Sequence, residues 1–171
     1  MTELIRNPKK MTKAINELQT VITKKRHIEE SNISKLPYLH AIIKEIFKLH
    51  PVVPLLLPHK VEGDIEINSY LVPKNTPTLV NMWAIGRDYN LWSTPTSFKP
   101  ERFLGSKIDI SGQEFDLIPF GSGIRICVGL PLAYQMVHLV VATLIEKFNW
   151  EVGGGIKLEE MNMDEKFELS L

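Results

Sequence analysis

The sequence is poor in cysteine: Cys127 is the one thiol in 171 residues. No internal disulfide can form, which excludes a secreted scaffold held together by disulfide bonds. A structural zinc site would need further ligands from the five histidines, and their spacing around Cys127 matches none of the usual zinc patterns. Cys127 is therefore either an inert side chain in a glycine-rich loop or a single ligand with a chemical role.

The sequence also lacks an excess of either charge, because 20 Lys and Arg residues balance 20 Asp and Glu residues. Proteins that bind nucleic acid usually carry a basic surface, so no nucleic-acid partner is expected. The longest apolar run, residues 139–145, is much shorter than a membrane-spanning helix, and Met1 is followed by no apolar signal segment. The sequence predicts no membrane anchor.

What the sequence does contain is the periodicity of a mainly helical chain with small β-sheets, an α+β fold in one domain. Helices are predicted over residues 2–6, 8–23, 37–50 and 131–148, because prolines bound them and apolar residues recur every three or four positions. The last helix is predicted to bury a stripe made of Ala133, Met136, Val137, Val140, Val141, Leu144, Ile145 and Phe148.

The segments between these helices are predicted to be extended or irregular. A hairpin is expected from residues 64–67 and 70–72 around Asn68-Ser69, and a strand over residues 78–82 before a short helix. Residues 90–114 are rich in Pro, Ser and Gly, but we expect them to be ordered. The reason is that their large aromatic side chains need burial, namely Trp92, Phe98 and Phe103.

The most informative segment is the glycine-rich loop at residues 115–129, which reads Pro-Phe-Gly-Ser-Gly-Ile-Arg-Ile-Cys-Val-Gly from position 119. Its glycines let the backbone turn tightly and approach a flat ligand. Cys127 stands just before the predicted N-terminus of the last helix, where the helix dipole and free N–H groups favour a thiolate. Arg125 offers a planar cation to a carboxylate, and Phe120 offers an apolar wall, so the loop suits a haem with its propionates.

The spacing of this loop, Phe120-x-x-Gly123-x-Arg125-x-Cys127-x-Gly129, resembles the haem-binding signature of the cytochrome P450 family. Five such positions would coincide by chance on the order of one time in ten thousand, from average residue usage. The resemblance covers essentially the whole chain, residues 1–171, as a partial domain. That domain is similar to the C-terminal part of the cytochrome P450 fold, from the end of the central helix through the cysteine loop and the last long helix.

Two further segments resemble motifs of this family in the same order along the chain. Glu45 and Lys48 resemble its Glu-x-x-Arg helix and, three residues apart, share a helix face. The segment from Phe98 to Phe103 resembles the one that supplies a second arginine, here Arg102. The resemblance therefore implies a structural triad of Glu45, Lys48 and Arg102. Residues 81–88 look like plant microsomal members, and the likeness is to geraniol 8-hydroxylase-like enzymes.

The resemblance implies a haem-thiolate monooxygenase in which Cys127 is the axial ligand of the iron of haem b. In the family, dioxygen is split, one atom enters a small lipophilic substrate, here of terpenoid kind, and NADPH–cytochrome P450 reductase supplies electrons. Relatives sit on the endoplasmic reticulum membrane. The residues implied to bind the cofactor are Phe120, Gly121, Gly123, Arg125, Cys127, Gly129 and His59. Those implied to line the substrate, with plain core packing as the alternative, are Val52, Val53, Leu55 and Leu56.

The chain departs from the family pattern at several positions. Lys48 stands where the family has arginine, and a lysine is a point donor that cannot make the same forked contacts. His59 stands where an arginine usually meets a propionate, and Ile124 and Val128 replace the commoner basic residue and proline. By resemblance, the residues that activate dioxygen precede Met1, so we expect no catalytic residue within this chain and no activity from it alone.

Three functions remain open from the sequence. The first is a truncated monooxygenase that is active only at full length. The second is a non-catalytic remnant that folds poorly and binds haem weakly or not at all. The third is a small haem-binding or sensor module built on Cys127, a function that leaves Glu45 and Arg102 without a purpose.

Overall fold

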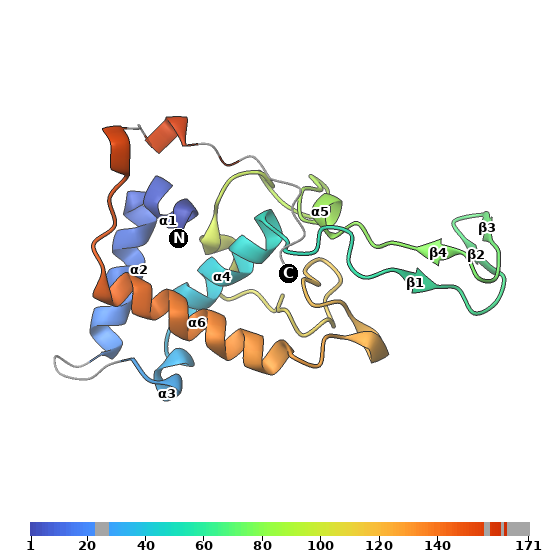
Figure 1. Cartoon of the computed structure of the whole chain (residues 1–171), viewed down its shortest axis with the longest axis horizontal. Helices are drawn as coiled ribbons and strands as arrows, with labels where there is room; N and C mark the ends of the chain where they lie inside the picture. Colours follow the sequence, from blue (N-terminus) through green and yellow to red (C-terminus); the bar gives the residue numbers. More distant parts are fainter. Residues whose placement is uncertain (23–27, 156–157, 162, 164–171) are drawn as a thin grey trace.

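The computed structural model describes residues 1–22, 28–155, 158–161 and 163. Figure 1 shows a helical body at one end and a β-rich extension at the other. The helices are α1 (Thr2–Arg6), α2 (Pro8–Val21), α3 (Glu30–Ile33), α4 (Pro37–Leu49), α5 (Met82–Ile85) and α6 (Leu130–Lys147). The strands are β1 (His59–Lys60), β2 (Ile65–Ile67), β3 (Tyr70–Val72) and β4 (Pro77–Thr78). Short 3-10 turns are η1 (Pro100–Phe103), η2 (Gly123–Arg125), η3 (Gly153–Gly155) and η4 (Leu158–Glu160).

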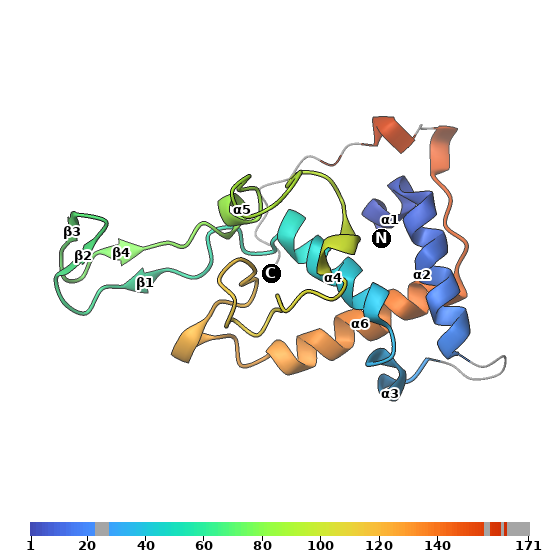
Figure 2. The same ribbon diagram turned by 180° about the vertical axis from the view of Figure 1, so that it is seen from behind.

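Helix α4 is the centre of the core, and it begins at Pro37 as the sequence predicts. Proline suits the first helical position, because its missing N–H has no partner there in any helix. The helix packs against α2, α6 and η1, and Figures 1 and 2 show α2, α4 and α6 gathered together from both sides. Its apolar stripe is buried, with Leu39, Ile42 and Ile43 all at most 3% exposed.

The first two helices are separated at the Asn7-Pro8 step, also as predicted. Asn7 has φ −121° and ψ 71°, which is the non-helical conformation that a residue before proline prefers. Its amide Nδ2 donates to the Glu3 carbonyl at 2.8 Å, so the end of α1 is capped while α2 starts at Pro8. Ala14 and Leu18 then carry the buried face of α2.

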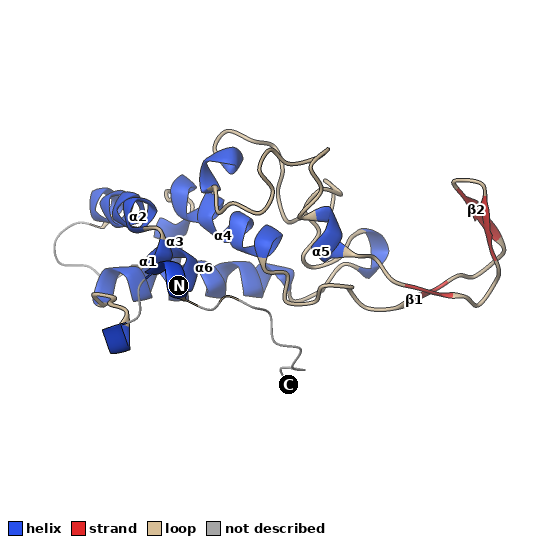
Figure 3. Cartoon of the chain, turned by 90° about the horizontal axis from the view of Figure 1, so that it is seen from above, coloured by secondary structure: helices blue, strands red, loops and turns tan. Residues whose placement is uncertain are grey.

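The β-rich extension consists of two antiparallel pairs, β1 with β4 and β2 with β3. In the second pair Ile65 lies opposite Val72 and Ile67 opposite Tyr70. Asn68 and Ser69 join these strands with φ values of 47° and 67°, which matches the primed turns that suit the twist of a hairpin. The predicted hairpin is thus confirmed, and Figure 3 shows the strands lying away from the helices.

The predicted strand over residues 78–82 is wrong. Strand β4 ends at Thr78, and Met82 instead opens helix α5. The Asn81 side chain accepts a hydrogen bond from the Ala84 N–H at 3.0 Å, and Met82 is fully buried. An N-cap and one buried anchor outweigh the β-propensity of the preceding residues.

The segment from residue 90 to 114 is ordered although it contains little regular structure, as predicted. Trp92, Phe98 and Phe103 are each less than 10% exposed. The Trp92 indole donates to the Ile85 carbonyl at 3.1 Å, and its ring meets that of Phe103 at 5.6 Å between centroids. These contacts hold the segment against α4 through η1.

The predicted buried stripe of α6 is wrong in part. The residues buried there are His138, Ala142 and Ile145. Met136, Val140 and Phe148 of the predicted stripe are instead 49%, 47% and 58% exposed. Apolar residues surround nearly the whole of α6, so periodicity could not select its inner face. In the part of the chain that the structure describes, no helix has the length and apolar character needed to cross a membrane.

Candidate functional site

The cysteine loop folds back on itself directly before α6. Gly121 and Gly123 have φ values of 76° and 65°, a region that glycine adopts without steric cost. The Cys127 N–H donates to the Phe120 carbonyl at 2.9 Å, which closes the loop. The Leu130 N–H donates to the Cys127 carbonyl at 3.2 Å, so the cysteine is tied to the first turn of the helix.

The Cys127 side chain is exposed. A Cβ at Gly129 would lie 3.7 Å from its Sγ, which is ordinary van der Waals contact, so Gly129 lies directly beside the sulfur. Two apolar residues close to it in the sequence, Ile124 and Val128, are also exposed. The loop presents its thiol outward, in contrast to an inert, buried cysteine.

The residues of the loop fit a haem. The described residues include no cluster of three or more His, Cys, Asp and Glu side chains that could hold a bare metal ion. A haem iron, however, takes four ligands from its porphyrin and needs one protein ligand, such as a cysteine thiolate. One exposed sulfur beside glycines and apolar side chains satisfies that need.

Phe120 and Arg125 take different places around the sulfur. Phe120 is half-buried and packs edge-on against Phe47 of α4, with 5.4 Å between the ring centroids. It therefore anchors the loop to the core. Arg125 ends the short turn η2, two residues before Cys127, and its side chain is exposed. His59 is exposed too, but it lies on β1, a separate segment.

The four predicted substrate-lining residues follow α4. Val52, Val53 and Leu55 are 76%, 41% and 45% exposed, so they do not belong to the core that the described residues form. Leu56 is half-buried and has φ 50°, which is unusual for a leucine.

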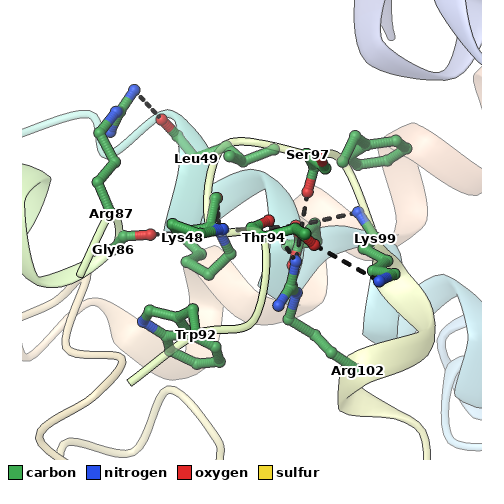
Figure 4. A network of polar contacts seen from close by, with 12 residues as sticks. Lys48, Leu49, Gly86, Arg87, Trp92, Thr94, Ser97, Lys99 and Arg102 are labelled. Atoms are coloured by element: carbon green, nitrogen blue, oxygen red, sulfur yellow. Dashed lines mark hydrogen bonds and ion pairs between the residues drawn. The ribbon is translucent and has the colours of Figure 1, made fainter. Parts of the chain in front are cut away.

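The structure brings the three residues of the predicted triad together, as Figure 4 shows in part. Glu45 and Lys48 are fully buried, and Arg102 reaches them from η1. The Arg102 Nε lies 3.0 Å from Glu45 Oε2, and the Lys48 Nζ lies 3.6 Å from Glu45 Oε1. The Lys99 N–H also donates to Glu45 Oε1 at 3.0 Å. One carboxylate thus collects two cations and a backbone donor.

The two cations of the triad donate to different backbone carbonyls between residues 86 and 95. Arg102 donates to the carbonyls of Ser93 at 2.7 Å and Thr94 at 3.1 Å. Lys48 donates to the carbonyls of Gly86 at 3.2 Å and Pro95 at 2.5 Å. The lysine makes no fork, but it still reaches two carbonyls besides its ion pair with Glu45. Figure 4 shows its link to Gly86.

Burial sets the charge balance of this cluster. Burial lowers the pKa of the Lys48 ammonium to about 8, although the Glu45 carboxylate acts to raise it. Burial also raises the pKa of Glu45, against the opposing effects of Lys48, the Lys99 N–H and Arg102. The charges of Glu45 and Lys48 stabilise each other, because neither side chain can reach water.

A polar cluster that sequence reasoning missed joins α4 to α6. His40 Nδ1 lies 2.8 Å from His138 Nε2 and 2.6 Å from the Tyr134 hydroxyl. His138 is 1% exposed, and burial lowers its pKa to about 4. No local signal marks this pair, because the two histidines stand 98 positions apart.

Comparisons with known proteins identify relatives of the whole chain. The cytochrome P450 family model matches residues 1–169. The chain is 56% identical over 171 residues to cytochrome P450 76T24 of Catharanthus roseus, covering all of this chain and 34% of that protein. It is 49% identical to geraniol 8-hydroxylase of Catharanthus roseus, covering all of this chain and 35% of that enzyme. It is also 49% identical over 170 residues to iridoid oxidase of the same plant, covering 99% of this chain and 33% of that enzyme.

A solved structure supports the same relationship. A zebra fish cytochrome P450 with progesterone superposes with a TM-score of 0.76 at 35% sequence identity, covering 85% of this chain and 32% of that chain. The chain therefore spans about a third of the length of the relatives it matches.

Proposed function

Since the chain belongs to the cytochrome P450 family, we propose that it forms the haem-ligating part of a haem-thiolate monooxygenase. Cys127 would hold the iron of haem b through its sulfur. The observation that carries this proposal is the exposed sulfur of Cys127, which lies two residues before the α6 N-cap. The backbone N–H of Cys127 donates to the Phe120 carbonyl and holds the residue in this place. A thiolate there lies near the positive end of the α6 dipole, which stabilises negative charge.

The other residues of the loop shape the space around the porphyrin. Gly121, Gly123 and Gly129 would let the backbone approach the porphyrin closely, and Phe120 would supply an apolar wall. Arg125 carries a permanent positive charge, His59 can acquire one, and both side chains are exposed. These two residues would pair with the propionates.

The bound haem supplies oxygen activation, with electrons from NADPH–cytochrome P450 reductase. Val52, Val53, Leu55 and Leu56 line the substrate side, where exposed apolar side chains favour a small lipophilic substrate. The relatives named geraniol 8-hydroxylase and iridoid oxidase support a terpenoid substrate. By the same resemblance, the enzyme works at the endoplasmic reticulum membrane.

The buried triad favours this function over a small haem-binding or sensor module. On α4, Lys48 donates to the carbonyls of Gly86 and Pro95, and Glu45 accepts from the Lys99 N–H and pairs with Arg102. The triad thereby fixes residues 86–102 against α4. Such a scaffold has a purpose in positioning a large cofactor surface. A sensor loop around Cys127 would not require it.

The experiment is to add haem to the protein, reduce the iron and expose it to carbon monoxide. We expect a strongly red-shifted Soret band, the mark of a thiolate-ligated haem. Cys127→Ala should abolish the red shift, whereas the matched variant Ile124→Ala, in the same loop and also exposed, should retain it. Identical spectra for the unaltered protein and Cys127→Ala would refute the proposal.

A further inference from the structure

Gly112 is a buried glycine that lies against the cysteine loop. Its φ is +78°, and a Cβ at this position would come within 2.8 Å of the Gly121 carbonyl oxygen and 3.0 Å of the Ser122 Cα. It would also come within 2.9 Å of the Ile126 Cδ1. Real Cβ atoms essentially never come closer than about 3 Å, and two of these neighbours are backbone atoms that cannot turn aside.

The atoms that Gly112 touches stand beside the bond that closes the cysteine loop. Gly121 follows Phe120, whose carbonyl accepts the Cys127 N–H at 2.9 Å. Ile126 immediately precedes Cys127. Gly112 therefore packs against both arms of the loop, one residue from each end of this hydrogen bond.

The segment that carries Gly112 is itself fixed to the core. The Lys44 ammonium of α4 donates to the Ile108 carbonyl at 2.7 Å. Ile110 is 4% exposed, and Asp109 accepts hydrogen bonds from the Ser111 N–H at 2.9 Å and its hydroxyl at 2.5 Å. Residues 108–112 thus form a rigid bridge from α4 to the back of the loop.

We propose that Gly112 is a positioning residue for the Cys127 sulfur. Because Gly112 has no side chain, the 108–112 bridge packs directly against the cysteine loop and holds the sulfur where it can reach a haem iron. The part about iron rests on the proposed function. The contact between Gly112 and the loop does not. Any side chain at this position pushes the Gly121–Ser122 peptide away and loosens the Phe120–Cys127 hydrogen bond.

The chain offers a matched control in Gly105. Gly105 has φ +71°, close to that of Gly112, but nothing lies within 4 Å of the position of its Cβ. Gly112→Ala and Gly105→Ala therefore impose the same backbone strain, and Gly112→Ala alone adds the collision with the loop. Comparing the two variants separates loop positioning from general destabilisation.

The measurement is the hydrogen-exchange rate of the Cys127 amide in the protein without haem. In Gly112→Ala we expect this amide to exchange about tenfold faster, which corresponds to about 1.4 kcal/mol. Amides in the middle of α4 should keep their relative protection, and Gly105→Ala should leave the Cys127 amide unchanged. The proposal is wrong if both variants speed the Cys127 amide equally, or if Gly112→Ala leaves it unchanged.

A second variant decides the matter if Gly112→Ala does not fold. Ile126→Val removes the Cδ1 atom that covers Gly112 and introduces no backbone strain. It should speed exchange of the Cys127 amide about threefold, because loss of one packed methyl group weakens the contact between Gly112 and the loop. An unchanged rate in this variant would overturn the proposal.

The carbon monoxide spectrum separates failure of this proposal from failure of the proposed function. If the unaltered protein shows no thiolate-type Soret band but Gly112→Ala still speeds the Cys127 amide, the positioning stands and the haem assignment fails. If the band forms, Gly112→Ala should weaken or shift it and Gly105→Ala should not. A full band in Gly112→Ala would contradict the positioning role while the haem assignment stands.

Discussion

Burial determines what individual charged residues do in this protein. Glu45 and Lys48 are completely buried, and each satisfies the other's charge while Arg102 and backbone groups fill the remaining positions. A buried ion pair contributes little compared with apolar packing, but removal of one partner leaves a charge that water cannot reach. The stability of the protein should therefore depend on the positive charge of Lys48.

Replacement of Lys48 by methionine should lower the free energy of unfolding by about 3–5 kcal/mol, because Glu45 then stays buried with one cation and two carbonyls lose their donor. Denaturant titration measures this loss. The matched control is Lys13→Met, since Lys13 pairs with Glu101 at a similar 3.6 Å but both side chains are more than 40% exposed. The control should cost less than about 1 kcal/mol. Equal losses in the two variants would contradict the interpretation.

His138 should make stability depend on pH in the acid range. Burial lowers its pKa to about 4 in the folded state from 6.5, so between these values the unfolded chain binds more protons than the folded one. Stability is then complete above about pH 6.5 and falls as the pH approaches 4, by on the order of 3 kcal/mol at most. His138→Gln should flatten the curve of unfolding free energy against pH, whereas His59→Gln, on an exposed strand, should not. Parallel curves for His138→Gln and the unaltered protein would refute this role.

At the scale of the element, α4 depends on a neighbouring helix for its N-terminus. Its own N-cap residue, Leu36, offers no side-chain acceptor. The Glu17 carboxylate of α2 fills this place, accepting from the Tyr38 N–H at 2.7 Å and the Leu39 N–H at 2.9 Å. A negative charge there also complements the helix dipole. Helices α2 and α4 are thus joined by a cap as well as by packing.

Loss of this cap should destabilise the protein measurably. Glu17→Ala should lower the free energy of unfolding by about 1–2 kcal/mol, as for other helix caps. Glu17→Gln keeps one acceptor oxygen and should lose about half as much, and Glu62→Ala, an exposed carboxylate, should have no effect. Thermal unfolding followed by circular dichroism measures all three. A Glu17→Ala variant as stable as Glu62→Ala would exclude the capping role.

At the scale of the whole molecule, the structure leaves much apolar surface exposed. Ile124, Val128 and Leu132 are 103%, 99% and 65% exposed, and they follow one another through the cysteine loop into α6. A protein rarely leaves such side chains grouped at its surface unless they bind something. The surface around the candidate iron ligand is thus suited to an apolar ligand or another part of a larger fold.

Because of this surface, residues 1–171 alone should bind apolar molecules and one another. We expect strong binding of a fluorescent hydrophobic dye, together with self-association detected by light scattering. The double variant Ile124→Ser with Val128→Ser should reduce both signals. Leu71→Ser, which removes an apolar side chain that is 71% exposed on the distant strand β3, should leave them nearly unchanged. Equal reductions from the two changes would indicate that no particular surface is responsible.

The sequence alone determined the features that depend on neighbouring residues. Prolines set the starts of α2 and α4, Asn68-Ser69 set the hairpin turn, and the glycine-rich motif indicated the exposed cysteine before α6. It also indicated the meeting of Glu45 with Arg102, through a resemblance between motifs. These features were predictable because backbone sterics, turn chemistry and motif spacing act over a few residues.

The tertiary structure decided the features that depend on contacts between distant residues. Partners on other elements define four such features: the inner face of α6, the helix at Met82, the cap from Glu17 and the contact of Gly112 with the cysteine loop. An apolar pattern shows that a face is buried but not which neighbour covers it. The physical reason is that packing and burial are set by the closed three-dimensional arrangement, which no short stretch of sequence contains.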